Sequence, residues 1–396
     1  MKKVTVVGAG PGNPELLTIQ AKLHIKRSDI VFATGRLFEK LGFLNQNTVR
    51  MTLSGLAHAV QAQPENVDIT ILASGDVGFY SISSLLTEQR GCVLSFQNGL
   101  SSLQYFCAKL RVPYDDIKTV SVHGRDVSAL PSVCYHPRVF VLTGGHQKAH
   151  DVICELISCG LGYVSVCVGE NLSDETERIV RGTAQELSNE HFTDLAVMLV
   201  ENPASVRACS FLRDADFVRG KVPMTKEAVR SLCVARLGIT PTDVVYDIGA
   251  GTGSVACAMA RFACESFVYA VEQNEDGISL IHENRQKLGA YNVKAIHGAA
   301  PECLKGLPAP DKVFIGGSSG NLGSIIDAAL EKNPDAKILA TAVTLETQAE
   351  ALRCFSERGI AADAMCVNIS QAEPFGSYHL MKAQNPVWLI GGARNG

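Results

Sequence analysis

The sequence lacks the features that mark membrane proteins and nucleic-acid-binding proteins. Across 396 residues no apolar run approaches the roughly 18 residues that a membrane-spanning helix needs, and the apolar start at Val4–Val7 is too short for a secretory signal. Lysine and arginine number 36 against 40 acidic residues, a net charge of -4, so no basic excess indicates nucleic acid. The sequence therefore predicts a soluble, cytoplasmic protein with no membrane or nucleic-acid partner.

Cysteine is present, but in no arrangement that indicates a metal site or a disulfide framework. The 13 cysteines are an odd number and include no Cys-x-x-Cys pair. The nearest approach to a ligand spacing is Cys154 with Cys159, and Cys134 two residues before His136. We interpret the cysteines as small apolar residues in a reducing compartment and predict no structural metal.

What the sequence has instead is a regular alternation of short apolar strands with helical segments. Short β-branched runs that end in Gly or Ser are typical of parallel strands buried on both faces. The predicted strands are Val4–Val7, Asp29–Ala33, Ile69–Ala73, Val93–Phe96, Thr119–Val122, Arg138–Leu142, Val164–Val168, Ala196–Val200, Asp243–Asp247, Ser266–Val271, Val293–His297, Lys312–Ile315 and Lys337–Thr341. A helix is expected from Pro14 to Ile25, with Asn13 as its N-cap.

The grouping of these strands predicts an α/β protein that divides near residue 210. We expect a first domain over residues 1–205, with lobes of about 1–118 and 119–205. A connector follows at 206–221, marked by polar breaks and the charged stretch Arg213–Asp216. A second α/β domain then occupies residues 222–396. Each part is long enough for a core of its own.

The most informative motif is the glycine-rich stretch Asp247–Ser254, which follows a strand and precedes an apolar helical pattern. A strand, a glycine turn and a helix let backbone N–H groups approach a nucleotide-like ligand. Glu272 ends the next strand, where a carboxylate can accept hydrogen bonds from ribose hydroxyls. The stretch therefore predicts a mononucleoside pocket at the carboxyl edge of a sheet.

Two other interpretations of this stretch compete. A dinucleotide site requires the pattern Gly-x-Gly-x-x-Gly, but Ser254 occupies the sixth position. The pattern Gly-x-Gly-x-Gly preceded by an acid favours S-adenosylmethionine over a nicotinamide cofactor. The remaining alternative is a tight turn without a ligand, with Glu272 a solvated strand end.

A second glycine loop, Gly8–Pro14, lies near the N-terminus. It is not a dinucleotide fingerprint either, because Asn13 takes the place of the third glycine and Pro11 has no N–H for a phosphate. The turns Ser74–Tyr80 and Gly99–Ser102 also follow predicted strands, at the edge where α/β sheets bind ligands. Alone, the first loop is as compatible with an ordinary turn as with a site, and the other two turns are more often plain loops.

Taken together, the motifs resemble two families of methyltransferases. The first half resembles the tetrapyrrole methylases, especially the subgroup that methylates carbon 5 of precorrin-6Y or its cobalt counterpart. The second half resembles the enzymes that methylate carbon 15 and decarboxylate. The matching stretches are Gly8–Leu17, Gly75–Tyr80, Gly99–Ser102, Val122–Arg125 and Gly169–Leu172, then Val222–Glu227, Asp247–Ser254, Gly298–Glu302, Pro310–Ser318, Thr344–Thr347 and Asn385–Val387. The resemblance covers nearly the whole chain and is that of a fusion, the decarboxylating precorrin-6Y C5,15-methyltransferases.

The resemblance implies a bilobal tetrapyrrole methylase domain followed by a Rossmann-like class I methyltransferase domain. It also implies a role in cobalamin biosynthesis, S-adenosylmethionine as cofactor, and a homo-oligomer. It assigns cofactor contacts to Pro11, Asp76, Phe79, Ser101, Ser102, Thr225, Gly249, Ala250, Gly251, Thr252, Gly253, Glu272 and Ala299. The chain departs from the pattern at Val77, where proline is usual, and at Ala258, where glutamate is common; the latter puts any role of that glutamate in doubt.

The chemistry of such a reaction requires few strong catalytic groups. The donor is a sulfonium whose leaving group needs no acid, and the macrocycle itself can take the electrons that decarboxylation releases. Arg125 and Lys226 are candidates to bind substrate carboxylates, with a solvated surface cation as an equal alternative. His123 is a weaker candidate to move a proton, because a loop histidine of that kind more often has a structural role. The competing functions are a nicotinamide-dependent oxidoreductase and a nucleoside-binding regulatory protein. The sequence leaves open whether the substrate carries cobalt.

Overall fold

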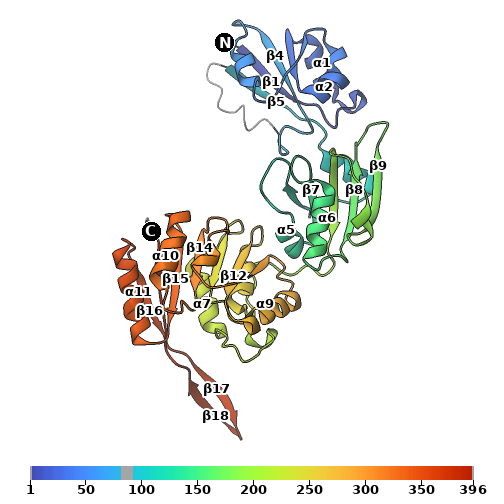
Figure 1. Ribbon diagram of the computed structural model, residues 1–396. Helices are drawn as coiled ribbons and strands as arrows, with labels where there is room; N and C mark the ends of the chain where they lie inside the picture. Colours follow the sequence, from blue (N-terminus) through green and yellow to red (C-terminus); the bar gives the residue numbers. More distant parts are fainter. Residues whose placement is uncertain (1, 82–91, 395–396) are drawn as a thin grey trace. The chain divides into compact units, whose positions relative to one another are not determined.

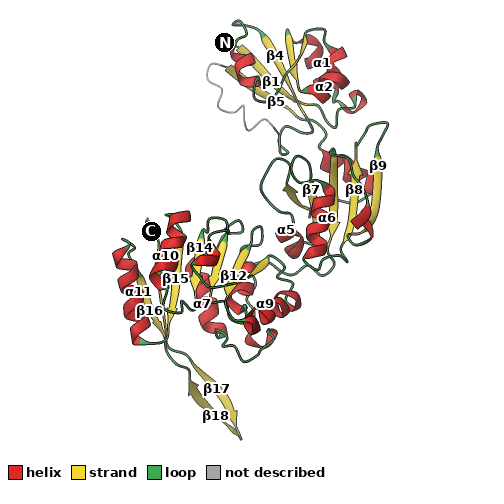
Figure 2. Ribbon diagram, viewed as in Figure 1, coloured by secondary structure: helices red, strands yellow, loops and turns green. Residues whose placement is uncertain are grey.

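The computed structural model describes residues 2–81 and 92–394 (Figures 1 and 2). Its chain divides into two compact units. The first unit comprises Met1–Arg125, Phe140–Ile153 and Ser165–Val200, and the second comprises Asp126–Val139, Cys154–Val164 and Glu201–Gly396. Within the described ranges, no helix is long and apolar enough to cross a membrane.

The first sheet has five strands, and its four pairings are all parallel. Its order is β3-β2-β4-β1-β5, and its strands are β1 (Lys2–Gly8), β2 (Ile30–Ala33), β3 (Thr48–Arg50), β4 (Asp68–Ala73) and β5 (Cys92–Gln97). Alternate side chains of a strand face opposite sides, so Val6 packs with helix α3 (Leu56–Gln61) while Val7 packs with α1 (Ile19–Arg27) and α2 (Gly35–Leu41). The four predicted strands of this lobe are confirmed, and the short edge strand β3 is added.

The single helix expected from Pro14 to Ile25 is wrong. Asn13 does cap a turn, accepting a hydrogen bond from the Glu15 amide at 2.9 Å, but that turn is a 3-10 helix of three residues, Pro14–Leu16. The chain then extends so that Leu17 enters the core. Thr18 begins α1 as a new cap, its hydroxyl accepting from the Ala21 amide at 3.0 Å. The second cap and the burial of Leu17 together divide the helix.

The second sheet has the order β6-β7-β10-β8-β9. Its strands are β6 (Lys118–Ser121), β7 (Arg138–Leu142), β8 (Ser165–Glu170), β9 (Arg178–Thr183) and β10 (Ala196–Glu201). Along the chain, α4 (Ser102–Leu110) precedes β6, α5 (Leu130–Tyr135) lies between β6 and β7, and α6 (Ala149–Ser158) lies between β7 and β8. Phe106 of α4 packs against Phe140 and Leu199 of this sheet. Strand β9 is antiparallel to β8 and largely polar, which explains why no apolar run predicted it.

The third sheet has seven strands in the order β13-β12-β11-β14-β15-β19-β16. These are β11 (Val245–Ile248), β12 (Val268–Glu272), β13 (Val293–His297), β14 (Lys312–Ile315), β15 (Lys337–Ala342), β16 (Asp363–Val367) and β19 (Val387–Gly392). The first five are parallel, and β19 runs antiparallel to both β15 and β16. The strand order reverses at β11, and ligands of α/β sheets bind outside the carboxyl ends of the strands at such a reversal.

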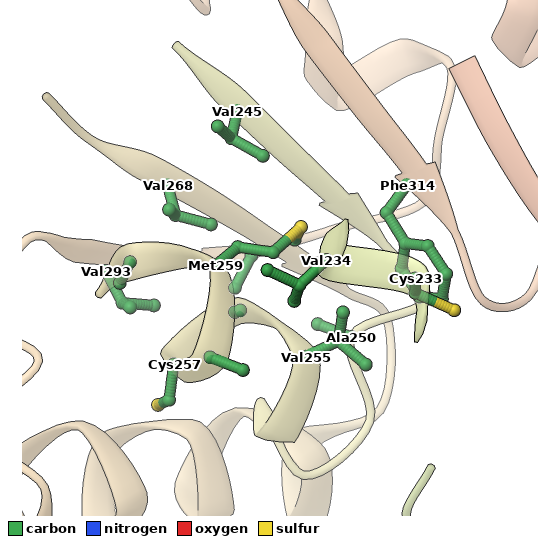
Figure 3. Close-up of a cluster of buried hydrophobic side chains, with 14 of the residues drawn as sticks. Cys233, Val234, Val245, Ala250, Val255, Cys257, Met259, Val268, Val293 and Phe314 are labelled. Atoms are coloured by element: carbon green, nitrogen blue, oxygen red, sulfur yellow. The ribbon is translucent and has the colours of Figure 1, made fainter. Parts of the chain in front are cut away.

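Helices cover both faces of this third sheet. Helices α7 (Glu227–Leu237), α8 (Ser254–Ala260) and α9 (Glu275–Lys287) share one core, and α10 (Leu322–Lys332) and α11 (Leu345–Glu357) share the other. Figure 3 shows Met259 of α8 with Val245 and Val268 of the sheet. Burial raises the pKa of the Cys233 and Cys257 thiols to about 12, so both pack here as neutral, apolar side chains.

The sequence interpretation of the cysteines holds for part of the set. None of the thirteen, all within the described ranges, forms a disulfide, and those buried are Cys107, Cys134, Cys233, Cys257, Cys264 and Cys354. Cys154 and Cys209, however, are exposed. The remaining cysteines are partly buried.

A two-stranded hairpin projects from the second unit between β16 and β19 (Figure 1). Strands β17 (Ser370–Phe375) and β18 (Tyr378–Ala383) pair only with each other, and every residue of both is exposed. No sequence pattern predicted this hairpin.

The segment expected as a connector packs firmly onto the second unit. Leu212 and Phe217 are buried in its core beside Arg230, a fully buried arginine of α7. The Arg230 guanidinium donates to the Leu212 carbonyl at 2.7 Å, to the Thr225 carbonyl at 2.8 Å and to the Asp214 carboxylate at 3.0 Å. It also lies 4.6 Å from the centre of the Phe217 ring. One buried cation thus fixes the path of the chain from Leu212 to Thr225.

Replacing Arg230 with methionine should lower the free energy of unfolding of the second unit by about 3–5 kcal/mol, because it leaves a partly buried carboxylate and two carbonyls without their donor. Arg219→Met is the matched control, since Arg219 also pairs with Asp214 but is half exposed; it should cost less than about 1 kcal/mol. Urea denaturation followed by the fluorescence of Trp388, the single tryptophan, reports on this unit. If both variants lose the same unfolding free energy, Arg230 does not have the structural role assigned to it.

Candidate functional site

The glycine loop after β11 passes closer to its neighbours than any side chain would allow. Gly249 has a φ of 70°, and a Cβ there would stand 2.6 Å from the Gly317 carbonyl oxygen. Gly251 has a φ of 56° and lies against the Pro223 carbonyl. These left-handed conformations suit glycine and leave the loop's backbone N–H groups at the carboxyl edge of the sheet.

Glu272, at the end of β12, is tied to this loop. One carboxylate oxygen accepts a hydrogen bond from the Gly251 amide at 2.7 Å, and the other accepts from the Asn274 amide at 2.8 Å. The residue is 9% exposed and borders the cavity described below. Glu272 is therefore a structural part of the loop, and each of its oxygens keeps a lone pair for a ligand hydroxyl.

Asp247, the acid that precedes the glycines, is fully buried. Burial raises its pKa from 3.8 to about 7; the Ala256 backbone N–H opposes this rise and the negative Glu272 adds to it. One of its carboxylate oxygens has no hydrogen-bond partner among the described residues. Sequence reasoning noted this acid only as part of the motif and did not assign it to the site.

A cavity of about 790 Å³ opens at the same edge of the sheet. The predicted residues that line it are Thr225, Lys226, Gly249, Ala250, Gly251, Glu272 and Ala299. Thr252 and Gly253 do not line it: Thr252 is buried below the loop, and Gly253 packs on Ile281 at the start of α8. The volume lies near the top of the roughly 300–1,000 Å³ typical of small-molecule sites.

Sequence reasoning missed a polar part of this cavity, which consists of Ser318, Asn321, Gln384 and Asn385. Ser318 and Asn321 follow β14, while Gln384 and Asn385 lead into β19. Because β19 is antiparallel, the residues that precede it reach the carboxyl edge of the parallel strands. The motif Asn385–Val387 was visible in the sequence, but without β19 nothing placed it near the glycine loop.

The first unit has a second group of close backbone contacts. Gly10 and Gly75 exchange two backbone hydrogen bonds, of 3.1 and 2.8 Å. A Cβ on Gly8, at the end of β1, would stand 2.5 Å from the Gly99 nitrogen. The first glycine loop and the turns after β4 and β5 therefore meet at one edge of the first sheet.

Asp76 joins two of these three segments. One of its carboxylate oxygens accepts from the Gly78 amide at 2.8 Å, and the other accepts from the Gly99 amide at 3.0 Å. The Pro11 carbonyl accepts from Arg36 at 2.6 Å, which holds the glycine loop against α2. Asp76 thus plays the same part for its glycine turns as Glu272 does in the second unit.

The other predicted residues of the first unit lie around this edge. Ser101 is buried and caps α4, its hydroxyl accepting from the Gln104 amide at 3.1 Å, and Ser102 is the first residue of that helix. Phe79 is half-buried, with its ring centre 6.2 Å from that of Phe140. Because the Ser101 side chain already caps α4, its position needs no ligand to explain it.

The candidate substrate-binding residues are all exposed. Arg125 lies 5.3 Å from the centre of the Tyr80 ring, which brings it beside the turn that carries Asp76 and Phe79. The His123 ring packs on Gly144, with Nδ1 3.3 Å from the Thr143 carbonyl. Lys226 is the N-cap residue of α7 and lines the cavity of the second unit.

Comparison with known proteins assigns each half of the chain to a family. Residues 3–188 match the tetrapyrrole (corrin/porphyrin) methylases, and residues 216–391 match the precorrin methyltransferase domain. A probable cobalt-precorrin-6B C(15)-methyltransferase (decarboxylating) of Pyrobaculum calidifontis is 38% identical over 171 residues, covering 43% of this chain and 88% of the relative. The corresponding Salmonella typhimurium enzyme is 36% identical over 182 residues, covering 45% of this chain and 94% of its own.

One relative is similar along nearly the whole chain. A precorrin-6Y C(5,15)-methyltransferase [decarboxylating] of Sinorhizobium is 26% identical over 393 residues, covering 97% of this chain and 94% of the relative. Among solved structures, a precorrin-6Y C5,15-methyltransferase from Geobacter metallireducens is 35% identical over 45% of this chain and 93% of its own, with a TM-score of 0.43.

The two family matches and the similar sequences define the protein as a methyltransferase. The chain belongs to the precorrin methyltransferases, with a tetrapyrrole methylase domain preceding a Rossmann-like methyltransferase domain. Membership of this family implies a methyl donor and a tetrapyrrole substrate. The oxidoreductase and the regulatory protein that competed at the level of sequence are therefore set aside.

The raised pKa of Asp247 predicts a pH dependence of stability. Between about pH 4 and pH 7 the folded protein keeps Asp247 protonated while the unfolded chain ionises it, so stability falls as the pH rises, by at most about 1.4 kcal/mol per pH unit. Above about pH 7 Asp247 is ionised in both states, so it no longer makes the stability depend on pH. Asp247→Asn does not titrate, so its unfolding free energy relative to wild type should rise between pH 4 and 7 and stay constant above. A pH-independent difference would show that Asp247 is ionised throughout.

Proposed function

We propose that the protein methylates precorrin-6Y, or its cobalt form, at two ring carbons and decarboxylates an acetate side chain, with S-adenosylmethionine as the donor. The observation that carries the proposal is the presence of two glycine-loop sites on two different sheets, each held by its own acid, Asp76 or Glu272. The name of the Sinorhizobium relative, which is similar over both halves, supports this reaction. This reaction is a step of cobalamin biosynthesis.

We assign carbon 5 to the tetrapyrrole methylase domain and carbon 15, with decarboxylation, to the Rossmann-like domain. The relatives that match only the second half are named for C(15) methylation and decarboxylation, which supports this division. The domains are taken as residues 1–205, with lobes of about 1–118 and 119–205, and 222–396, joined by 206–221. The packing of Leu212 and Phe217 supports treating most of that connector as part of the second fold.

In the Rossmann-like domain the cofactor would lie along Gly249–Gly251, with its ribose hydroxyls at Glu272 and further contacts at Thr225 and Ala299. The cavity that these residues line supports the assignment. Thr252 and Gly253 would act by shaping the loop from below. In the first domain, Pro11, Asp76, Phe79, Ser101 and Ser102 would surround the second cofactor molecule.

The reaction would depend mainly on positioning. A bound sulfonium donor supplies an activated methyl group, so the protein has to hold that group in line with an electron-rich ring carbon; such orientation accounts for as much as about 7–11 kcal/mol of a barrier. Arg125, beside the first site, and Lys226, at the second, would bind peripheral carboxylates of the macrocycle. His123 would accept or return a proton at the first site.

Glu272→Ala and Asp76→Ala should each disable one of the two reactions. Losing hydrogen bonds from a charged acceptor costs about 1.5–3 kcal/mol, so the affinity of the affected site for S-adenosylhomocysteine should fall roughly 10- to 100-fold. The full-length variants are supplied with precorrin-6Y, with or without cobalt, and isotope-labelled donor, and NMR locates the methyl groups. Glu272→Ala should keep the methyl at carbon 5 and lose the one at carbon 15, and Asp76→Ala should do the reverse. Parallel loss of both methyl groups in either variant would refute the division.

We also propose that the protein is a homo-oligomer joined through the β17–β18 hairpin. An isolated two-stranded hairpin is marginal in water, and a contiguous exposed apolar patch marks an interaction site. The strand pairing puts Phe375, Tyr378 and Leu380 on one face of the hairpin, exposed by 66%, 74% and 55%, and the Glu373–Lys382 ion pair lies on the same face. A second copy would cover this face with the same residues.

The double variant Phe375→Asp/Leu380→Asp should therefore form smaller particles than the wild type, because a charged carboxylate buried in an apolar contact is costly. His379→Asp is the matched control, since His379 points to the opposite face of the same hairpin. Sedimentation velocity measures the particle mass. Unchanged mass in the double variant, or a wild-type protein that is monomeric at micromolar concentration, would exclude this interface.

A further inference from the structure

The cavity of the second unit has two chemically different parts. The first part is bordered by the glycine loop, residues 249–251, and by the carboxylate of Glu272. At the ends of β14 and β19 the lining side chains are neutral hydrogen-bonding groups, Ser318, Asn321, Gln384 and Asn385. In the sheet order, β19 is three strands from β11 and β14 is one, so this neutral part extends about 5–14 Å from the cofactor loop.

Two amides in the neutral part are not used by the fold. Asn321 occupies the N-cap position of α10, yet its side chain does not cap the helix, and no hydrogen bond to that amide exists among the described residues. The Asn385 side chain also has no hydrogen-bond partner in the described part of the chain, and it is exposed at the cavity. Gln384, by contrast, is held by Gln371 at 3.0 Å. Two free amides therefore border the cavity with their donors available.

Charge is sparse around this cavity. Among its described lining residues Lys226 is the only cation and Glu272 the only anion. A tetrapyrrole with several carboxylates would meet one lysine here, so most of its contacts would be with neutral groups. This composition is unusual for a site that only has to bind an anion, where arginine is the commoner choice.

Resting on the proposed function, we propose that Asn321 and Asn385 hold the acetate carboxylate that is lost, and that they hold it without a cation. In the step itself the bond between the acetate methylene and the carboxyl carbon breaks. Its electron pair moves to the methylene carbon and into the conjugated macrocycle, carbon dioxide leaves, and a proton from water completes the methyl group.

Neutral donors suit this step better than a cation. The carboxylate charge is localised on two oxygens in the ground state and is dispersed over the macrocycle in the transition state. A cation beside the oxygens would stabilise the ground state more than the transition state and raise the barrier, since only interactions stronger in the transition state accelerate a reaction. Amide N–H groups orient the carboxylate while stabilising its charge less than an ammonium would. Lys226 would bind a carboxylate that the product retains.

Asn385→Lys tests this charge argument directly in the full-length protein. Carbon dioxide release at saturating tetrapyrrole should slow about 10- to 100-fold, the factor expected for a hydrogen bond to a charged group gained only in the ground state. The affinity for S-adenosylhomocysteine should stay within about threefold, because the cofactor loop is untouched. Asn368→Lys is the matched control: Asn368 is exposed and does not line the cavity, so release should be unchanged.

The double variant Asn321→Ala/Asn385→Ala should also slow release at least tenfold, because the carboxylate loses both donors. If Asn385→Lys releases carbon dioxide at the wild-type rate, the inference is wrong. It is also wrong if the rate of carbon dioxide release falls only in proportion to a loss of S-adenosylhomocysteine affinity. If the wild-type protein methylates carbon 15 but releases no carbon dioxide, the proposed decarboxylation fails and the inference fails with it.

Discussion

Both sites depend on one steric constraint, the passage of glycine backbones closer to a neighbouring segment than a side chain permits. At Gly8 a Cβ would stand 2.5 Å from Gly99, and at Gly249 it would stand 2.6 Å from Gly317. Each close approach lies at the carboxyl edge of a parallel sheet, beside the central strand. The loops can therefore turn sharply there and bring their backbone to the carboxyl edge of the sheet, which is where α/β sheets bind nucleoside-like cofactors.

Carboxylates hold these glycine turns in place. Asp76 and Glu272 each accept two backbone N–H groups, so the two units use the same means on unrelated sheets. Asp247 differs, because it lies beneath its loop where burial raises its pKa to about 7. Arg230 completes the second site from the other side by fixing the segment that ends at Thr225, which lines the cavity.

Much of this architecture could be predicted from the sequence, because buried parallel strands are short apolar runs with clear ends. All thirteen predicted strands are present, within a few residues of their expected limits. Two of the missed strands lack that signal, because polar residues interrupt β9 and β16 is mostly exposed. Strand β19 has an apolar run that ends in glycine and was overlooked, and nothing in the sequence shows that it runs antiparallel. The helix at Pro14 was misjudged because Thr18 provides a second cap. Glu272 was found because it follows a glycine motif at a strand end, whereas Asn321 and Asn385 came together only through the placement of β19.

The central claim is that one chain holds two cofactor sites, one on each unit. Calorimetric titration of the full-length protein with S-adenosylhomocysteine tests it most directly. The account predicts a stoichiometry near two per chain, with one of the two sites weakened roughly 10- to 100-fold by Glu272→Ala and the affinity of the other unchanged. A stoichiometry of one on fully active protein would contradict the claim.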